Sequence, residues 1–261
     1  MNVPEAEIFP LLKGKVAIVT GGSQGMGKAT ASVFLRAGAK VVIGDVKEKE
    51  GNETVAELSQ HGDILFVRTD ISKSEEVRNL VAQTVARFRK LDVAINNAAL
   101  TPDSTPLIDF DETYWSKLMD INLTGTALCC KWEMQQIIKQ GSKGSIVNIA
   151  SINAFKTLPN MPAYTAAKHA LIGLTKHAAM EGGPKGIRVN AIAPGAIFSD
   201  MAVSALKIIG STVEEFAPTV SYLNRFGMAH EVAHGSLWLS SDSASYITGV
   251  CLPIDGGCLA K

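Results

Sequence analysis

The sequence predicts an α/β fold, a single domain built on a doubly wound parallel sheet of about seven strands with helices on both faces. Short apolar, β-branched runs alternate along the chain with longer segments of helical character, and the connections between them are short. Such alternation is typical of parallel strands whose crossover helices cover both faces of the sheet. The 261 residues, of which 46% are hydrophobic, suffice for one large domain with a substantial core.

The elements follow in order along the chain. The predicted strands are residues 15–20, 40–45, 63–68, 92–96, 144–149, 187–192 and 249–254. The main helices are expected at about residues 28–37, up to 61, from Ser72, 111–140, 163–182 and around 230–240. The helix after the third strand has a capping-box pattern, Ser72-Lys-Ser-Glu75. Residues 1–12 are expected to form a flexible arm, and residues 13–261 the domain.

The first strand leads into a loop with three spaced glycines. This loop and the following helix start indicate a nucleotide site, because glycines let the backbone approach a pyrophosphate and the helix N-terminus attracts its charge. The spacing Gly-x-x-x-Gly-x-Gly alone is weak evidence, since many plain strand–helix turns contain glycine. The loop residues predicted to bind the cofactor are Gly21, Ser23, Gln24, Gly25, Met26 and Gly27.

The second strand ends in an acidic residue, Asp45, eighteen positions after Gly27. This is about where a carboxylate accepts hydrogen bonds from the adenosine ribose of a dinucleotide. The same charge repels a 2′-phosphate, and Gln24 and Val46 offer no cation to attract one. The sequence therefore favours NAD, although Lys47 leaves NADP open.

Other polar residues also lie at strand ends. Asp70 follows the third strand and Asn96 ends the fourth, at the edge where parallel sheets bind ligands. Asp70 could contact the adenine or cap the next helix, and Asn97 could bind the cofactor or serve as a turn residue.

A candidate catalytic pair lies on the later helix. Tyr164 and Lys168 are four residues apart, so they share one helix face, and Ser151 lies thirteen residues upstream. A free tyrosine has a pKa of about 10, and a neighbouring cation is expected to lower the pKa of Tyr164 toward the range useful for proton transfer. An ordinary tyrosine and lysine on an exposed helix face is the alternative for the pair taken alone.

Together, Tyr164, Lys168, Ser151, the Gly21–Gly27 loop and Asn96-Asn97-Ala98 resemble the classical short-chain dehydrogenase/reductases, from about residue 13 to 257. The resemblance implies a Rossmann fold and a hydride transfer between a nicotinamide cofactor and a secondary alcohol or ketone. It makes Tyr164 the general acid and base, with Ser151 donating to the substrate oxygen. It assigns Asn122 to a water-linked proton relay with Lys168, which also holds the nicotinamide ribose.

The resemblance extends the predicted cofactor site beyond the glycine loop. The further residues that it implies are Asp70, Ile71, Asn97, Ala98, Tyr164, Lys168, Pro194, Gly195, Ile197 and Ser199. Two of the positions depart from the family pattern. Ala99 stands where a glycine is usual, and Ser199 stands where the family usually has a threonine that bonds the nicotinamide carboxamide.

The substrate side is expected to be apolar. Residues 196–218 are predicted to form a mobile lid, which would enclose a pocket with Phe155, Leu158 and Met161. A fixed surface helix is the alternative for the lid. No carboxylate clamp stands out, so a neutral or weakly polar alcohol or ketone is favoured.

Two other functions compete with this one. A non-catalytic, nucleotide-binding regulator could share the fold, but it would be favoured by a missing catalytic residue, and none is missing. A zinc hydrolase is suggested only by His230-Glu231-Val-Ala-His234, a His-Glu-x-x-His pattern. The surrounding helix already has a place in the resemblance, so no metal site is predicted.

Composition excludes several partners. The formal net charge is zero and no basic cluster occurs, which disfavours nucleic acid and anionic membranes. The four cysteines have no disulfide-like spacing, which indicates a reduced, cytoplasmic setting. The resemblance also implies a homotetramer, with contacts through the two long helices and the last strand.

Overall fold

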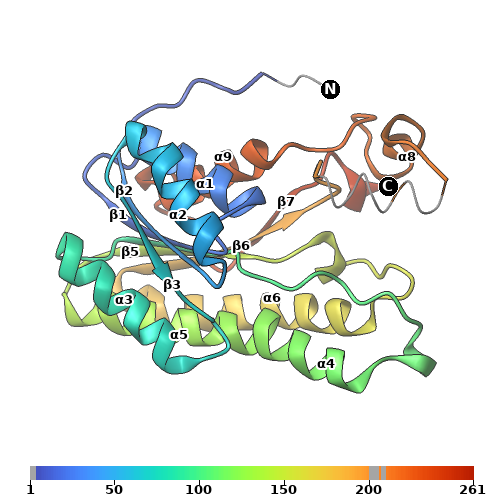
Figure 1. Ribbon diagram of the computed structural model, residues 1–261, viewed down its shortest axis with the longest axis horizontal. Helices are drawn as coiled ribbons and strands as arrows, with labels where there is room; N and C mark the ends of the chain where they lie inside the picture. Colours follow the sequence, from blue (N-terminus) through green and yellow to red (C-terminus); the bar gives the residue numbers. More distant parts are fainter. Residues whose placement is uncertain (1–3, 200–205, 207–209) are drawn as a thin grey trace.

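Seven parallel strands form the centre of the computed structural model, which describes residues 4–199, 206 and 210–261. Their order across the sheet is β3-β2-β1-β4-β5-β6-β7 (Figure 1). The strands are β1 (Val16–Thr20), β2 (Lys40–Asp45), β3 (Ile64–Arg68), β4 (Val93–Asn96), β5 (Gly144–Ile149), β6 (Ile187–Pro194) and β7 (Cys251–Ile254). The predicted fold class is confirmed, and each strand lies within two residues of its expected bounds.

Helices cover both faces of this sheet. They are α1 (Gly25–Arg36), α2 (Glu48–Leu58), α3 (Ser74–Phe88), α4 (Glu112–Met119), α5 (Thr126–Lys139), α6 (Pro162–Gly182), α8 (Val213–Val220) and α9 (Ala229–Ser240). Helices α1 and α9 pack together on one face, while α3, α5 and α6 lie on the other (Figure 1). Every residue of β1 is buried between these layers, and the first four, residues 16–19, are all apolar.

The strand order reverses beside β1. The chain moves outward from β1 to β2 and β3, then returns to place β4 on the other side of β1. Ligands of such sheets bind in the crevice at the carboxyl ends of the strands flanking this reversal. The fold therefore predicts a ligand site among the residues that follow β1, β2 and β4.

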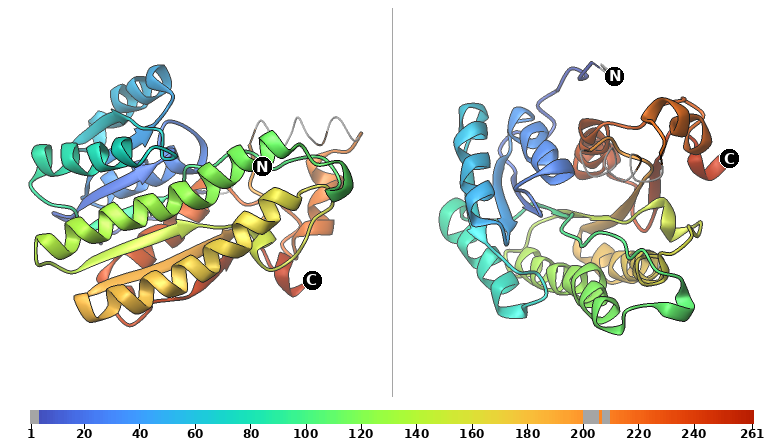
Figure 2. Two further views of the ribbon diagram at one scale, coloured as in Figure 1. Left: turned by 90° about the horizontal axis from the view of Figure 1, so that it is seen from below. Right: turned by 45° about the vertical axis from the view of Figure 1, so that its right-hand side comes forward.

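The predicted helix over residues 111–140 is continuous but irregular. A π-helical turn, Asp120–Gly125, joins α4 to α5, and the combined helix runs alongside α6 (Figure 2). Such widened turns occur often at functional sites. Here the turn contains Asn122, the residue expected in the proton relay.

The capping-box prediction at Ser72 was wrong. Helix α3 begins at Ser74, and its N-cap residue Lys73 makes no side-chain cap. The amide and hydroxyl of Ser72 both donate to Asp70 Oδ1, at 3.0 and 2.7 Å. The Ser72 hydroxyl is thus engaged in the turn before the helix, and Asp70 organises that turn.

The domain begins earlier than residue 13. The Leu12 side chain is fully buried in the core, so it does not belong to the predicted arm. Before it, Glu5 forms a 2.6 Å ion pair with Arg36 of α1. The flexibility of the arm stays a prediction.

The lid region is described only in part. Residues 200–205 and 207–209 of the predicted lid lie outside the described residues. Helix α8 starts with a capping box between Thr212 and Glu215, and Val213 and Ala217 pack in a small apolar cluster with Phe226. No helix in the described part of the chain combines the length and apolar character needed to cross a bilayer.

Candidate active site

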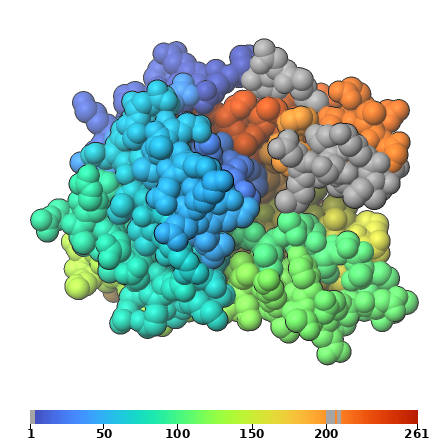
Figure 3. Space-filling view, viewed as in Figure 1, coloured from blue at the N-terminus to red at the C-terminus, as the bar shows by residue number. Residues whose placement is uncertain are grey.

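A cleft of about 430 Å³ opens at the carboxyl ends of β1, β2 and β4. Figure 3 shows this face of the molecule hollowed between the blue and the green segments. Ten of the residues predicted to bind a cofactor line it: Gly21, Gln24, Gly25, Met26, Asp45, Asp70, Ile71, Asn97, Ala98 and Tyr164. The fold thus brings the glycine loop and the candidate catalytic tyrosine to one cavity.

The glycine loop leaves room for a ligand at the start of α1. Gly25 has φ of 54°, and a Cβ placed on it would meet no atom within 4 Å, so this backbone is open to close approach. A Cβ on Gly27 would lie 2.1 Å from the Gly21 carbonyl oxygen, so this glycine is needed for packing within the loop. An open turn and unpaired helix N–H groups fit a dinucleotide pyrophosphate.

Asp45 is held in place at the end of β2. Its Oδ2 accepts hydrogen bonds from the Ser23 amide and hydroxyl, and its Oδ1 accepts from the Lys47 amide. Ser23, predicted as a cofactor contact, is buried and does not line the cleft; it fixes the Asp45 carboxylate. The Lys47 ammonium donates to Gln24 Oε1 at 2.9 Å, so it bridges the glycine loop and the end of β2.

Asn97 connects the glycine loop to the end of β4. Its Nδ2 donates to the carbonyl oxygens of Thr20 and Gly21, at 3.0 and 3.2 Å. The Thr20 hydroxyl oxygen accepts from the amides of Asn97 and Ala98. The Asn97 side chain is therefore committed to the backbone of the cleft wall. Thr20 was not predicted, although a hydroxyl at the end of the first strand was visible in the sequence.

Lys168 and Ser151 both lie next to Tyr164, which lines the cleft. Helix α6 places the Lys168 ammonium 5.4 Å from the centroid of the Tyr164 ring. The ammonium donates to the Ile149 carbonyl oxygen at the end of β5, at 2.8 Å. Ser151 follows β5, and its Oγ accepts a 3.1 Å hydrogen bond from the Asn153 amide. The alternative of an exposed Tyr–Lys pair is wrong, since Lys168 is 3% exposed.

The expected fall in the Tyr164 pKa is not found. Burial raises the pKa of Tyr164 above its ordinary value, and a hydrogen bond with Ser151 acts in the opposite direction. Burial also lowers the pKa of Lys168 to about 8. With this pKa the Lys168 amine is mostly protonated at neutral pH and loses its charge in the mildly alkaline range, where a phenolate would form, and burial disfavours the phenolate itself.

Asn122 lies in the π-helical turn and is buried. Its Oδ1 accepts from the Leu100 amide at 2.7 Å, and its Nδ2 donates to the Leu100 carbonyl oxygen at 3.3 Å. These bonds fix the segment after β4, which lines the cleft. The water-linked relay between Asn122 and Lys168 stays a prediction.

The remaining predicted residues lie on or beyond β6. Pro194 ends β6, and the Gly195 amide donates to the Ile254 carbonyl oxygen of β7. Ile197 lines a separate cavity next to Gly227, and Ser199 is exposed. Eight further residues line the cleft that were not predicted, each within four positions of a predicted one: Val46, Lys47, Thr69, Ala99, Leu100, Thr101, Pro102 and Ile121.

The His-Glu-x-x-His pattern has a structural explanation. Glu231 forms two 2.7 Å contacts with the Arg225 guanidinium and accepts from the Met228 amide at the start of α9. His230 and His234 stack edge to face with ring centroids 6.3 Å apart. Within residues 4–199, 206 and 210–261, no group of three or more His, Cys, Asp or Glu side chains is arranged to hold a metal ion.

Comparison with known proteins agrees with this geometry. A family model described as enoyl-(acyl carrier protein) reductase matches residues 21–258. The short chain dehydrogenase/reductase astE of Aspergillus oryzae is 46% identical over 248 residues, which cover 94% of this chain and 95% of that protein. The chain belongs to the short-chain dehydrogenase/reductase family.

Two further members of the family are similar over nearly their whole length. A 2,5-dichloro-2,5-cyclohexadiene-1,4-diol dehydrogenase of Sphingobium indicum is 42% identical, over 94% of this chain and 97% of that protein. The crystal structure of carveol dehydrogenase from Mycobacterium avium in complex with NAD superposes with a TM-score of 0.91. The two sequences are 29% identical, and the superposition covers 96% of this chain and 99% of the carveol dehydrogenase chain. The protein is an oxidoreductase that transfers a hydride between a nicotinamide cofactor and a secondary alcohol or ketone.

Proposed function

We propose that this short-chain dehydrogenase/reductase is an NAD(H)-dependent dehydrogenase of neutral cyclic secondary alcohols, with Tyr164 as its general acid and base. The observation that carries the proposal is the single cleft shared by the open glycine loop, Asp45 and Tyr164. The cofactor, when bound, supplies the hydride acceptor or donor. The protein supplies position and proton transfer.

In the oxidative direction, Tyr164 as phenolate takes the proton from the alcohol oxygen. In the reductive direction, its hydroxyl protonates the oxygen of the former ketone. The Asn153 amide occupies one lone pair of Ser151 Oγ, and the Ser151 hydroxyl, which hydrogen-bonds with Tyr164, would donate to the substrate oxygen, where charge changes during reaction. Lys168 would hold the ribose and, with a pKa of about 8, can exchange protons in the mildly alkaline range.

The preference for NAD rests on Asp45. Ser23 and the Lys47 amide hold its carboxylate at the end of β2, on the cleft wall. A 2′-phosphate brought to this place would meet a fixed negative charge, while the nearby Lys47 ammonium bonds to Gln24. The NAD complex of carveol dehydrogenase supports the same choice.

Replacing Asp45 is expected to relax this discrimination. Asp45→Asn keeps the shape of the side chain and an acceptor for Ser23 but removes the charge, and Asp45→Ala removes both. Fluorescence titration should give a ratio of NADPH to NADH dissociation constants at least about tenfold smaller in both variants, a change of about 1.4 kcal/mol. An unchanged ratio in Asp45→Asn would exclude charge repulsion at this position as the basis of the preference.

The substrate class rests on the apolar surroundings of Ser151 and Tyr164. Phe155 and Leu158, in the segment between them, are both exposed, as is Phe198 after β6. The relative from Sphingobium indicum, whose name specifies a six-membered carbocyclic diol, supports a ring substrate. A neutral ring fits apolar walls better than a charged acid does.

A turnover panel tests this proposal. NADH absorbance is followed with cyclohexanol, the cyclohexane-1,2-diols and cyclohexanone, against hexan-2-ol as an open-chain secondary alcohol and 4-hydroxycyclohexanecarboxylate as a charged ring. The neutral rings are expected to give the highest kcat/KM. Faster turnover of the open-chain or the charged compound would contradict the substrate class but leave the reaction intact.

We also propose a cytoplasmic homotetramer. The four cysteines are free, which fits a reducing compartment. Ile138 of α5 and Met180 of α6 are exposed apolar side chains on the two long helices that the family resemblance assigns to subunit contacts. Light scattering on the purified protein measures the assembly directly.

A further inference from the structure

The helix that carries Tyr164 starts without a local cap. Its first residue, Pro162, has no N–H, and its N-cap residue, Met161, makes no side-chain cap. The Thr165 amide bonds to the Met161 carbonyl oxygen, so the unpaired donors of this first turn are the amides of Ala163 and Tyr164. Both must find acceptors elsewhere, because unpaired amides in a buried place are costly.

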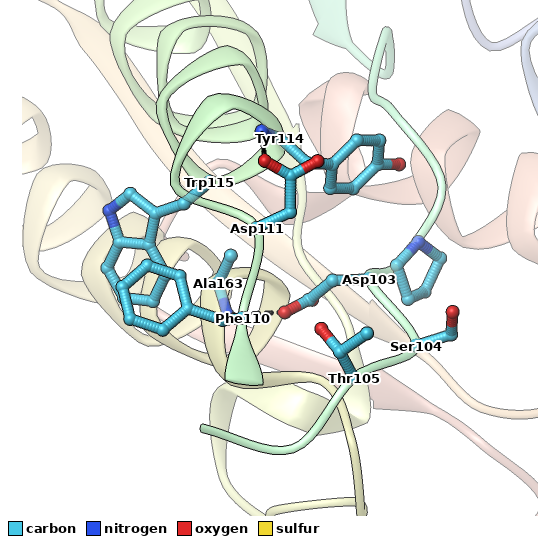
Figure 4. A pocket seen from close by; sticks show the side chains of 9 residues that line it. Asp103, Ser104, Thr105, Phe110, Asp111, Tyr114, Trp115 and Ala163 are labelled. Carbon is cyan, nitrogen blue, oxygen red and sulfur yellow. Dashed lines mark hydrogen bonds between the residues drawn. The ribbon is translucent and has the colours of Figure 1, made fainter. Parts of the chain in front are cut away.

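A carboxylate from a distant part of the chain supplies both acceptors. Asp103 Oδ2 accepts from the Ala163 amide at 2.9 Å, and Asp103 Oδ1 accepts from the Tyr164 amide at 3.0 Å. Figure 4 shows the Asp103 side chain pointing from its loop toward Ala163 at the start of α6. Asp103 is 8% exposed, and no ion pair involves it among the described residues. The positive end of α6 offsets its buried charge.

The loop that carries Asp103 is fixed at two further points. Asn122 holds both the amide and the carbonyl of Leu100, and the Tyr114 hydroxyl donates to the Thr101 carbonyl oxygen at 2.8 Å. Residues 99–102 of this loop line the cofactor cleft. One short segment therefore connects the cleft wall and Asn122 to the backbone of Tyr164.

We infer that Asp103 is a positioning residue, which sets the place of the Tyr164 hydroxyl relative to the cofactor by holding the first turn of α6 against the cleft wall. The inference rests on the proposed role of Tyr164. Hydride and proton transfer need close alignment of donor, acceptor and base, and a displacement of about 1 Å can cost about a hundredfold in rate. Lys168, one turn further along α6, is anchored independently through Ile149.

The test compares two substitutions at Asp103 with a matched control. Asp103→Ala removes both acceptors, whereas Asp103→Asn retains one oxygen and turns an amide NH₂ toward the other N–H. Asp111→Ala is the control, because Asp111 is the local N-cap of α4 and its Oδ1 accepts from the amides of Thr113 and Tyr114 at 2.8 and 3.2 Å. All three are expected to lower Tm, since Asp103→Ala and Asp111→Ala remove a helix cap and Asp103→Asn weakens one.

The rate constant of a single turnover separates positioning from stability, because it does not depend on the amount of folded enzyme. With NAD⁺ and the ring alcohol that the panel identifies, Asp103→Ala is expected to lower this constant about 10- to 100-fold. Asp103→Asn should give an intermediate value, and Asp111→Ala a value within about twofold of the wild type. KM and the NADH dissociation constant should stay within about threefold in all variants.

A double substitution tests whether Asp103 acts through Tyr164. Asp103→Ala in the Tyr164→Phe background is expected to cause no further loss of rate, because the group being positioned is already absent. A further tenfold loss there, or a single-turnover constant of Asp103→Ala or Asp103→Asn within twofold of the wild type, would overturn the inference. Wild-type activity in Tyr164→Phe would instead overturn the proposed function itself.

Discussion

Tyr164→Phe is expected to lower kcat for alcohol oxidation and ketone reduction by about 10²- to 10⁴-fold, the usual range for the loss of a general acid or base. The substitution removes only the hydroxyl, so the ring still fills its place beside Lys168. The NADH dissociation constant should therefore change little, and the loss should appear in kcat. Stopped-flow turnover together with NADH fluorescence titration measures both quantities.

The pH dependence of wild-type turnover also tests the role of Tyr164 in proton transfer. Burial raises the pKa of Tyr164, so the phenolate needed for oxidation forms only in the alkaline range. The value of kcat/KM for oxidation should rise with pH through that range, while kcat/KM for reduction, which needs the protonated hydroxyl, should fall there.

Tyr222→Phe is the control for Tyr164→Phe, because the Tyr222 hydroxyl bonds only to the Ala260 carbonyl oxygen in the described structure. Retention of more than about a tenth of wild-type kcat in Tyr164→Phe would contradict the assignment.

Glu133→Gln is expected to stabilise the protein at alkaline pH. Glu133 lies on α5 and is 1% exposed, and its Oε2 accepts a 3.1 Å hydrogen bond from Asn96 Nδ2. Burial raises the pKa of Glu133 to about 8. The folded protein therefore holds a proton between about pH 4.5 and 8 that the unfolded chain releases.

The direction in which stability changes with pH follows from this extra proton. Because the folded state binds the extra proton, the free energy of unfolding falls as pH rises, by up to about 1.4 kcal/mol per pH unit within that window. A neutral glutamine escapes this loss, so Glu133→Gln should be more stable than the wild type by about 2 to 4 kcal/mol at pH 8.5 and nearly equal to it at pH 5.

Urea unfolding of the wild type and Glu133→Gln at the two pH values measures the difference in their free energies of unfolding. Glu53→Gln is the matched control, since Glu53 is exposed and pairs only loosely with Lys49 at 3.9 Å; it should show no pH-dependent gain. Parallel pH dependence in the wild type and Glu133→Gln would show that this carboxyl is not protonated in the folded protein.

The sequence was most informative where local spacing decides structure. Strand–helix alternation predicted the sheet, and the four-residue interval on α6 predicted that Tyr164 and Lys168 would converge. The three spaced glycines predicted an open turn, which the structure has at Gly25. Each of these inferences depends on neighbours within one or two turns of the chain.

What the sequence could not supply depends on burial and on distant contacts. Asp103 meets Tyr164 across 61 residues, and no local pattern marks it as a cap for α6. Ser23 bonds to the Asp45 carboxylate, 22 residues further along the chain, and does not line the cleft. The direction of the Tyr164 pKa shift depends on how much water the assembled cleft excludes, and a helical interval alone does not contain that information.

A crystal structure of the protein with NAD⁺ and a slowly reacting cyclic alcohol would test whether Tyr164 and Ser151 both contact the substrate oxygen. We expect the Tyr164 hydroxyl and Ser151 Oγ both to lie about 2.6 to 3.2 Å from the alcohol oxygen, with the Lys168 ammonium at the cofactor ribose. A Tyr164 hydroxyl turned away from the cleft, with the Lys168 ammonium in solvent, would contradict this expectation.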